Sequence, residues 1–161
     1  MKSRTAVNKG RLLPRQGLRI RSRGADPEVR TTLIQFARWL RSQYDFPIRV
    51  PVYLYPSEML LTMHGKRVSA SFFAPWSRRV EPFIRIAAGE YLRLKKEWGR
   101  EYALASHLIS LAHEVIHYLQ WVETGETWER GVASRARAMV RRYYTDHSAP
   151  LAAASMDKGG T

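Results

Sequence analysis

The sequence predicts a single domain of the α+β class, and three observations support this prediction. The 161 residues match the size of one domain. Apolar residues make up 45% of the chain, which is enough to form a buried core. One segment with helical periodicity is followed by three short stretches rich in β-branched and aromatic residues, and then by two further helical segments.

The first predicted helix begins at Asp26-Pro27-Glu28. Asp can cap a helix, Pro fits the first helical turn, and Glu interacts favourably with the helix dipole there. Apolar residues then recur every three or four positions, at Val29, Leu33, Phe36, Leu40 and Tyr44. The helix is expected to end before Pro47, because the residue that precedes a proline disfavours helical geometry.

Three strands are predicted next, over residues 48–55, 67–74 and 80–88. Pro51 and Pro82 lie within the first and the third of these stretches. Proline cannot donate a backbone hydrogen bond to a neighbouring strand. These two strands are therefore expected at sheet edges, or they begin just after the proline.

Two helices are predicted to close the fold. A polar connector over residues 89–101 leads into the most strongly helical segment, residues 101–122. A further helix is expected from Thr127 to about Tyr144. Gly125 lies between the two helices and is suited to end the first of them.

The charge distribution suggests two tails around one domain. The chain has 27 Lys and Arg against 14 Asp and Glu, a net charge of +13. Residues 1–24 hold basic residues and no acidic ones, so they are expected to form a flexible basic arm that contacts a nucleic acid or an acidic partner, or merely aids solubility. Residues 25–146 are expected to form the domain, and residues 147–161 a flexible tail.

Composition also excludes several classes of site. The chain has no cysteine, so disulfides, iron–sulfur clusters, Cys-bound zinc and thiol nucleophiles are ruled out. No run of roughly 18 apolar residues suggests a membrane span. No apolar segment follows the basic N-terminus as in a secretory signal, so a cytoplasmic location is expected.

The motif that points to chemistry is HEVIH, residues 113–117. It places His113 and His117 one helical turn apart on one face, with Glu114 beside them. An apolar stripe lies on nearly the opposite face, formed by Leu104, Leu108, Leu111, Val115, Leu119 and Val122. The pattern therefore favours a metal site, although two ordinary helix histidines bound to water or carboxylates would have the same spacing. His107 lies about 120° around the helix and is expected to be structural.

The HExxH motif resembles that of the zincin class of metallopeptidases. The resemblance implies one zinc ion per chain bound by His113 and His117, with Glu114 as the general base that takes a proton from an activated water. It implies a minimal zincin-like domain, a protein or peptide substrate, and a strand over residues 80–88 that pairs with an extended substrate. Another metal with similar ligand preferences is also compatible with these residues.

Three glutamates are candidates for the third ligand: Glu123, Glu126 and Glu129. Glu123 has the metzincin spacing from His117, but Gln120 occupies the position where that pattern has a glycine. Glu129 is expected in the first turn of the next helix, packed antiparallel to the motif helix as in gluzincins. We therefore favour Glu129, although an acidic residue is also well placed there for the helix dipole.

These observations lead to a primary function and an alternative. The primary prediction is a small gluzincin-like zinc metallopeptidase, whose oxyanion donor is one of Tyr91, Tyr143, Tyr144, His147 or the arginines. The alternative is a basic nucleic-acid-binding or regulatory protein on a zincin scaffold, with little or no proteolytic activity. The basic arm and the spacing of Arg130, Arg137 and Arg141 on the last helix favour this alternative.

Overall fold

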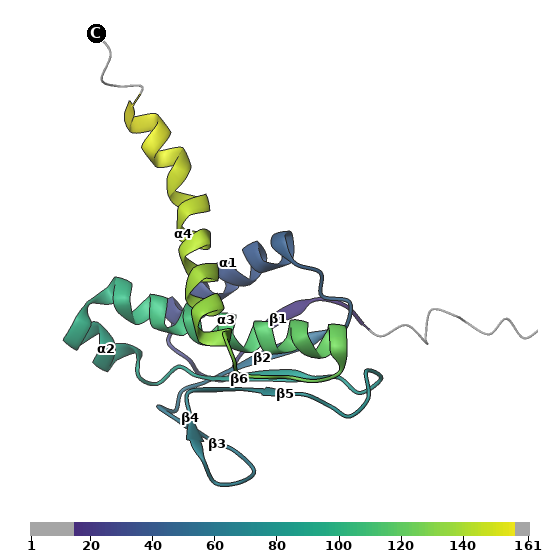
Figure 1. Cartoon of the computed structure of the whole chain (residues 1–161). Coiled ribbons are helices and arrows are strands. Elements are labelled where there is room, and N and C mark those ends of the chain that lie inside the picture. Colours follow the sequence, from purple (N-terminus) through teal and green to yellow (C-terminus); the bar gives the residue numbers. More distant parts are fainter. Residues whose placement is uncertain (1–14, 157–161) are drawn as a thin grey trace, which may run out of the picture.

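The computed structural model describes residues 15–156, with side chains described as far as residue 147. This part of the chain is a mixed α+β structure, as predicted (Figure 1). Its elements in chain order are β1 (Leu18–Ser22), α1 (Pro27–Gln43), β2 (Val50–Tyr55), β3 (Leu60–Leu61), β4 (Arg67–Val68), β5 (Ala70–Phe73), β6 (Phe83–Ala87), α2 (Tyr91–Trp98), α3 (Arg100–Thr124) and α4 (Val132–Met156). No helix in these residues combines the length and apolar character needed to cross a membrane.

Four strands form the main sheet, in the order β1-β2-β6-β5. β1, β2 and β6 are parallel, and β5 is antiparallel to β6. β3 and β4 form a separate hairpin. Helices α1 and α3 pack on one face of the sheet, which we call the inner face, and the hairpin lies on the other side in Figure 1. The opposite face is called the outer face.

The core forms where the inner face meets α1 and α3. Alternation along the strands turns every second side chain towards the helices. The inner face presents apolar side chains without exposed surface: Leu18, Val50, Val52, Leu54, Ile84 and Ile86. The predicted apolar residues of α1 face them, with Val29, Leu33, Phe36 and Leu40 fully buried.

The structure confirms the predicted bounds of α1. The Asp26 side chain caps the helix by accepting a hydrogen bond of 2.8 Å from the Glu28 N–H, and Pro27 occupies the first turn. The helix ends at Gln43, before Pro47. Local signals therefore determine both ends of this helix.

The expectation of edge strands for the two prolines is wrong, because β2 and β6 are both interior strands. Pro82 directly precedes β6, as the alternative prediction had it. Pro51 lies inside β2, next to Val50, whose N–H donates to Gly17 on the β1 side. The nitrogen of Pro51 therefore points towards β6, and pairing with β6 begins only at Val52.

The predicted basic arm is too long, because residues 18–22 form β1 and pair with β2 along its whole length. Residues 1–14 of the predicted arm lie outside the described residues. Leu18 and Ile20 alternate with arginines, so two apolar side chains reach the core from a strongly charged segment. The strand was not predicted because its two apolar residues stand among closely spaced arginines.

Two other segments are more helical than predicted. The expected polar connector, residues 89–101, contains α2, which buries only Tyr91 and so lacks the periodic apolar pattern that predicts a helix. The predicted C-terminal tail, residues 147–161, is helical as far as Met156, and residues 157–161 lie outside the described part. Its alanine-rich sequence has high helix propensity.

Candidate metal centre

The rotation of α3 about its axis is held by two aromatic side chains next to the motif. The Tyr118 hydroxyl donates to the Ile48 carbonyl (2.5 Å) and accepts from the Ile48 N–H (3.1 Å). Trp121 donates from Nε1 to the Pro75 carbonyl (2.9 Å). Both rings are buried and attach α3 to segments that border the sheet. The face of α3 that carries the two motif histidines is therefore held in one direction.

His113, His117 and Glu129 come together as predicted and form a group that can hold a metal ion. Nε2 of His113 lies 3.1 Å from one Glu129 carboxylate oxygen, and Nε2 of His117 lies 2.8 Å from the other. The three ligand atoms lie within 4.8 Å of one another. Ligand atoms bound to one tetrahedral zinc ion at the usual bond lengths are roughly 3.3 Å apart, so the donor set fits such an ion.

Glu129 reaches the histidines from a loop and not from a helix. The structure begins α4 at Val132, so the predicted start at Thr127 is wrong, and Glu129 lies in the connection before the helix. Figure 1 shows α4 crossing α3 steeply, and not lying antiparallel along it. Helix α3 continues to Thr124 and carries Glu123 past the site. This was expected, because Gln120 occupies the position where the metzincin pattern has a glycine that turns the chain. Neither Glu123 nor Glu126 belongs to the metal-binding group among the described residues.

Gln120 determines which nitrogen of His117 carries its proton. Its Oε1 accepts a hydrogen bond of 3.1 Å from the Trp128 N–H, so this atom must be the oxygen. The same oxygen lies 3.0 Å from His117 Nδ1, which must then be the donor. In a neutral imidazole this leaves a lone pair on Nε2, facing the Glu129 carboxylate. Two such acceptors at 2.8 Å repel each other unless a proton or a cation lies between them.

Gln120 contacts His117 and not the space between the three ligand atoms, and the motif did not predict its role at the site. Its only signal was its position three residues after His117, on the histidine face of the helix. Gln120 Nε2 is buried and has no partner among the described residues, so the amide is positioned through its oxygen alone. Rotating the amide by half a turn would set its NH₂ group against the Trp128 N–H and lose that hydrogen bond.

Glu114 is buried beside the ligands, with 7% of its surface exposed. Burial raises the pKa of its carboxyl to about 8, and the charge of Glu129 adds to this shift. Glu114 lines the same cleft as His113 and Glu129. The predicted base therefore lies in the wall of the cleft into which the metal-binding group opens.

The cleft has a volume of about 670 Å³ and lies between α3, the β3–β4 hairpin and β5. Ser69 and Ala70 bring the start of β5 to its wall, and Lys66 and Arg67 line it from the hairpin. β5 is the edge strand of the sheet next to α3. The prediction that the strand over residues 80–88 would receive an extended substrate is therefore wrong, because β6 is paired on both sides.

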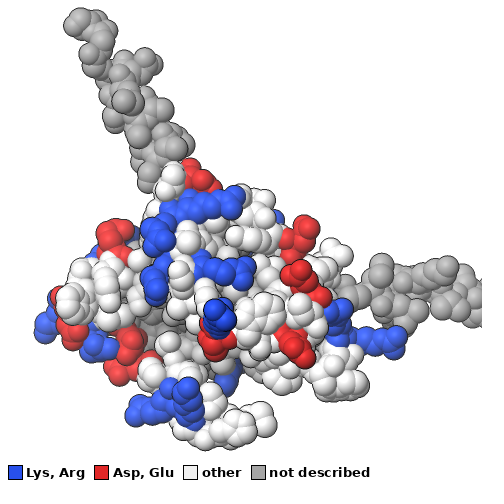
Figure 2. Space-filling view, viewed as in Figure 1, with Lys and Arg blue, Asp and Glu red and all other residues white. Residues whose placement is uncertain are grey.

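The arginines predicted as a stripe on the last helix are exposed. Figure 2 shows basic side chains gathered over α4. Arg137 and Arg141 lie on this helix, and Arg130 lies just before it, with all three exposed. Within the described part of the chain, none of the three forms an ion pair with an acidic residue. They do not line the cleft.

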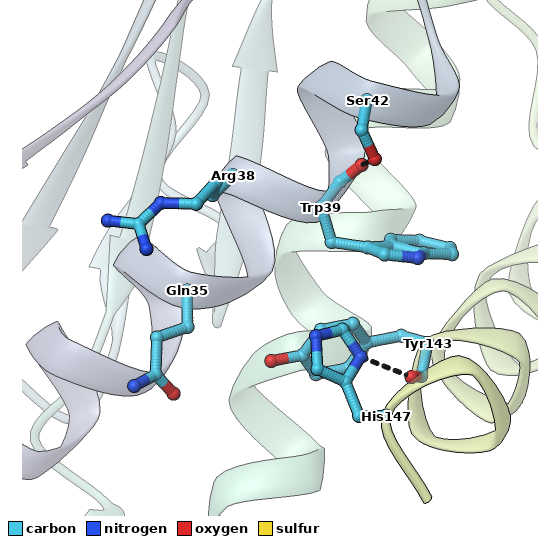
Figure 3. Close-up of a pocket in the computed structure, with 6 residues that line it drawn as sticks. All are labelled: Gln35, Arg38, Trp39, Ser42, Tyr143 and His147. Atoms are coloured by element: carbon cyan, nitrogen blue, oxygen red, sulfur yellow. Dashed lines mark hydrogen bonds between the residues drawn. The ribbon is translucent and has the colours of Figure 1, made fainter. Parts of the chain in front are cut away.

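Several candidate oxyanion donors have other positions. Figure 3 shows Tyr143 and His147 in a second pocket, together with Trp39 of α1. The ring nitrogen Nδ1 of His147 donates to the Tyr143 carbonyl (2.8 Å), and neither ring lines the cleft. The hydroxyl of Tyr91 donates to Glu28. Of the arginines, only Arg67 lines the cleft among the described residues.

Comparisons with known proteins add no assignment to this geometry. No protein-family model, curated protein or solved structure matches the chain. The resemblance to zincins therefore stays a prediction from the HExxH motif. What the structure adds is the group formed by His113, His117 and Glu129.

Proposed function

We propose that the chain is a zinc-dependent metallopeptidase of the HExxH type, with one zinc ion held by His113, His117 and Glu129. The observation that carries the proposal is the convergence of these three ligand atoms with the His117 tautomer already set by Gln120. Three nitrogen and oxygen ligands leave a fourth position for water, as in catalytic zinc sites.

An ion pair accounts for this cluster less well. To pair both histidines with Glu129, it would require both imidazoles to be protonated. The rings of His113 and His117 have centroids only 5.0 Å apart, so two protonated imidazoles would repel each other while sharing a single carboxylate. Two neutral imidazoles and one carboxylate around a divalent cation avoid the repulsion between charged rings and the repulsion between the His117 lone pair and the Glu129 carboxylate.

The catalytic chemistry depends on residues on either side of the ligands. When bound, zinc would act as a Lewis acid towards the substrate carbonyl and lower the pKa of a water. Glu114 would accept the proton of that water and transfer it to the leaving nitrogen of the peptide bond. Its position in the cleft wall, one residue from a proposed ligand, suits this role, because a metal cation that close would lower the pKa that burial raises and keep the carboxylate able to accept a proton.

The substrate we propose is an extended protein or peptide segment. The open edge of β5 offers backbone donors and acceptors for β-augmentation next to the metal-binding group. Lys66 and Arg67 place positive charge on the cleft wall, which favours segments with acidic side chains. The cytoplasmic location predicted from the sequence is part of this proposal.

The proposal is tested by comparing Glu114→Gln with Glu123→Gln, a matched change at an exposed glutamate of the same helix. Zinc content is measured by elemental analysis, and hydrolysis is followed on an unstructured protein such as casein. Wild type and Glu123→Gln should bind about one zinc ion per chain and cleave the substrate. Glu114→Gln should keep its zinc and lose activity by about 10²–10⁴-fold.

Two outcomes would contradict the proposal: no specifically bound zinc in wild type under zinc-replete conditions, or full activity in Glu114→Gln. A wild type that binds zinc but cleaves no substrate tested would favour the alternative, a regulatory or nucleic-acid-binding protein on the same scaffold.

A further inference from the structure

The outer face of the sheet carries a row of arginines on β1. Leu18 and Ile20 turn to the core, so the alternate residues Arg19 and Arg21 turn outward and are exposed. Arg23 follows directly after the strand and is exposed as well. Alternate residues of a strand are roughly 6.6 Å apart, comparable to the spacing of successive phosphates in an extended single strand.

This row is part of a larger surface, which we call the arginine surface. Three adjoining hollows are lined by Arg15, Arg19, Arg21, Arg23 and Arg49, with Arg78 and Arg79 added from the loop before β6. Glu81 is the single acidic residue among their lining residues. The guanidinium groups of these arginines form no ion pair or hydrogen bond with another described residue. The positive charge of the surface is therefore uncompensated within the described fold.

Arg49 lies in the wall of all three hollows. Its Nε is buried and has no hydrogen-bond partner among the described residues. A buried donor without a partner is unfavourable, and a water or an anion that reaches it would satisfy it. Arg49 is thus the residue that the three hollows share.

A row of aromatic rings continues from the arginine surface across the outer face. Tyr53 of β2, Phe83 of β6 and Phe73 of β5 lie side by side, with ring centroids 6.2 Å and 4.8 Å apart. Phe73 is 41% exposed, and the other two rings are half-buried. The Arg23 guanidinium lies 5.0 Å from the centre of the Tyr53 ring, where the two rows meet. Aromatic rings and guanidinium planes are the groups on which unpaired bases stack.

From these two rows we infer that the outer face binds a single-stranded nucleic acid, with its phosphates on the arginine surface and its bases on Tyr53, Phe83 and Phe73. Arginine, and not lysine, provides all the cations of this surface, and the guanidinium fork matches phosphate. An acidic protein segment would use the cations but leave the rings without a partner. A duplex would keep its bases stacked and out of reach of the rings.

This binding surface is separate from the proposed metal centre. None of its residues lines the cleft that contains His113 and Glu129. The inference therefore does not rest on the proposed peptidase function, and binding should be unchanged in Glu114→Gln and after chelation of metal.

The test is fluorescence anisotropy with labelled oligouridine and oligodeoxythymidine, using the full chain between about 50 and 200 mM salt. The variant Arg19→Gln/Arg21→Gln/Arg23→Gln should bind about tenfold more weakly or worse, with a salt slope reduced by roughly two, since each lost phosphate contact removes about 0.7. The control Arg135→Gln/Arg137→Gln/Arg141→Gln removes the same charge from exposed positions of α4 and should stay within about twofold of wild type.

A second variant separates base stacking from charge. Phe73→Leu, at the most exposed ring of the row, should weaken binding without changing the salt slope. Circular dichroism confirms that each variant is folded.

Four results would overturn the inference. They are no binding by wild type at low salt, equal losses in the two arginine variants, full affinity in Phe73→Leu, and displacement of the oligonucleotide by polyglutamate as effectively as by unlabelled oligonucleotide. The last of these would identify an acidic protein as the partner.

Discussion

Two histidines of α3 are equally buried, yet they lie in different chemical environments. His107 and His117 are 5% and 6% exposed, and each has a hydrogen bond at Nδ1. His107 donates to the carbonyl of Ala103, four residues back in its own helix, and its ring lies against Tyr91. His117 donates to the Gln120 side chain instead, and its Nε2 faces a carboxylate.

The difference indicates which features set the proposed metal ligand apart from an ordinary buried histidine. Burial and a bonded Nδ1 are common to both histidines. They differ at the other ring nitrogen, Nε2. Only the Nε2 of His117 lies close to a second histidine, His113, and to Glu129. The histidine in the N-terminal half of α3, His107, therefore has a structural role. The two histidines in the C-terminal half belong to the group that can hold a metal ion.

The largest effect is expected when the two histidines are compared directly. His117→Ala should lower zinc affinity by at least about 100-fold, because it removes a ligand. His107→Ala should retain wild-type zinc affinity and lower the free energy of unfolding by about 1–3 kcal/mol through lost packing. Competition with a zinc chelator measures the first quantity, and urea unfolding the second. Loss of zinc in a folded His107→Ala protein would show that the two histidines do not differ in this way.

Exchange of the glutamates should give the next largest effect. Glu129→Gln should weaken zinc binding by about 100-fold, because an amide is a poorer zinc ligand than a carboxylate. Glu123→Gln, the matched change at the glutamate with metzincin spacing, should leave the zinc affinity unchanged. Chelator competition on both purified variants provides the comparison. If Glu123→Gln proved to be the weaker zinc binder, the third ligand would be wrongly assigned.

The motif predicted the histidines well because i and i+4 spacing on a helix depends on local geometry alone. The same reasoning separated His107 from them by its angle around α3. Local spacing could not predict that Glu129 lies in a loop and not in a helix. That depends on where α4 begins, and the sequence between Gly125 and Val132 has no strong cap signal.

Other parts of the fold depended on long-range pairing. β1 is stabilised by β2, and Leu18 and Ile20 are its only apolar side chains. Its alternation was therefore too short to stand out from the surrounding arginines. Gln120 was visible on the histidine face, but its role depends on the Trp128 N–H, which the following loop brings back to it.

Gln120 offers an intermediate effect, because it would act on a bound metal only through its hydrogen bond with His117. Gln120→Leu removes the acceptor for Nδ1 and should lower zinc affinity by about 10–100-fold. Gln120→Glu keeps an acceptor at that position and should restore affinity close to that of wild type. Chelator competition separates the two variants, and circular dichroism verifies that both are folded. Equal zinc affinity in wild type and Gln120→Leu would show that the His117 tautomer is not controlled by this contact.

The smallest effect concerns the protonation of His107. Burial lowers the pKa of its imidazole, against the opposing effects of its bond to Ala103 and of the charge of Glu90. The folded state therefore resists protonation, while the unfolded chain takes up a proton near the ordinary histidine pKa of about 6.5. The stability that neutral His107 contributes is present above that pH and is lost as the pH falls below it. Metal-free wild type should thus lose more stability between neutral and mildly acidic pH than His107→Gln, as measured by urea midpoints. Identical pH dependence in the two proteins would contradict this assignment.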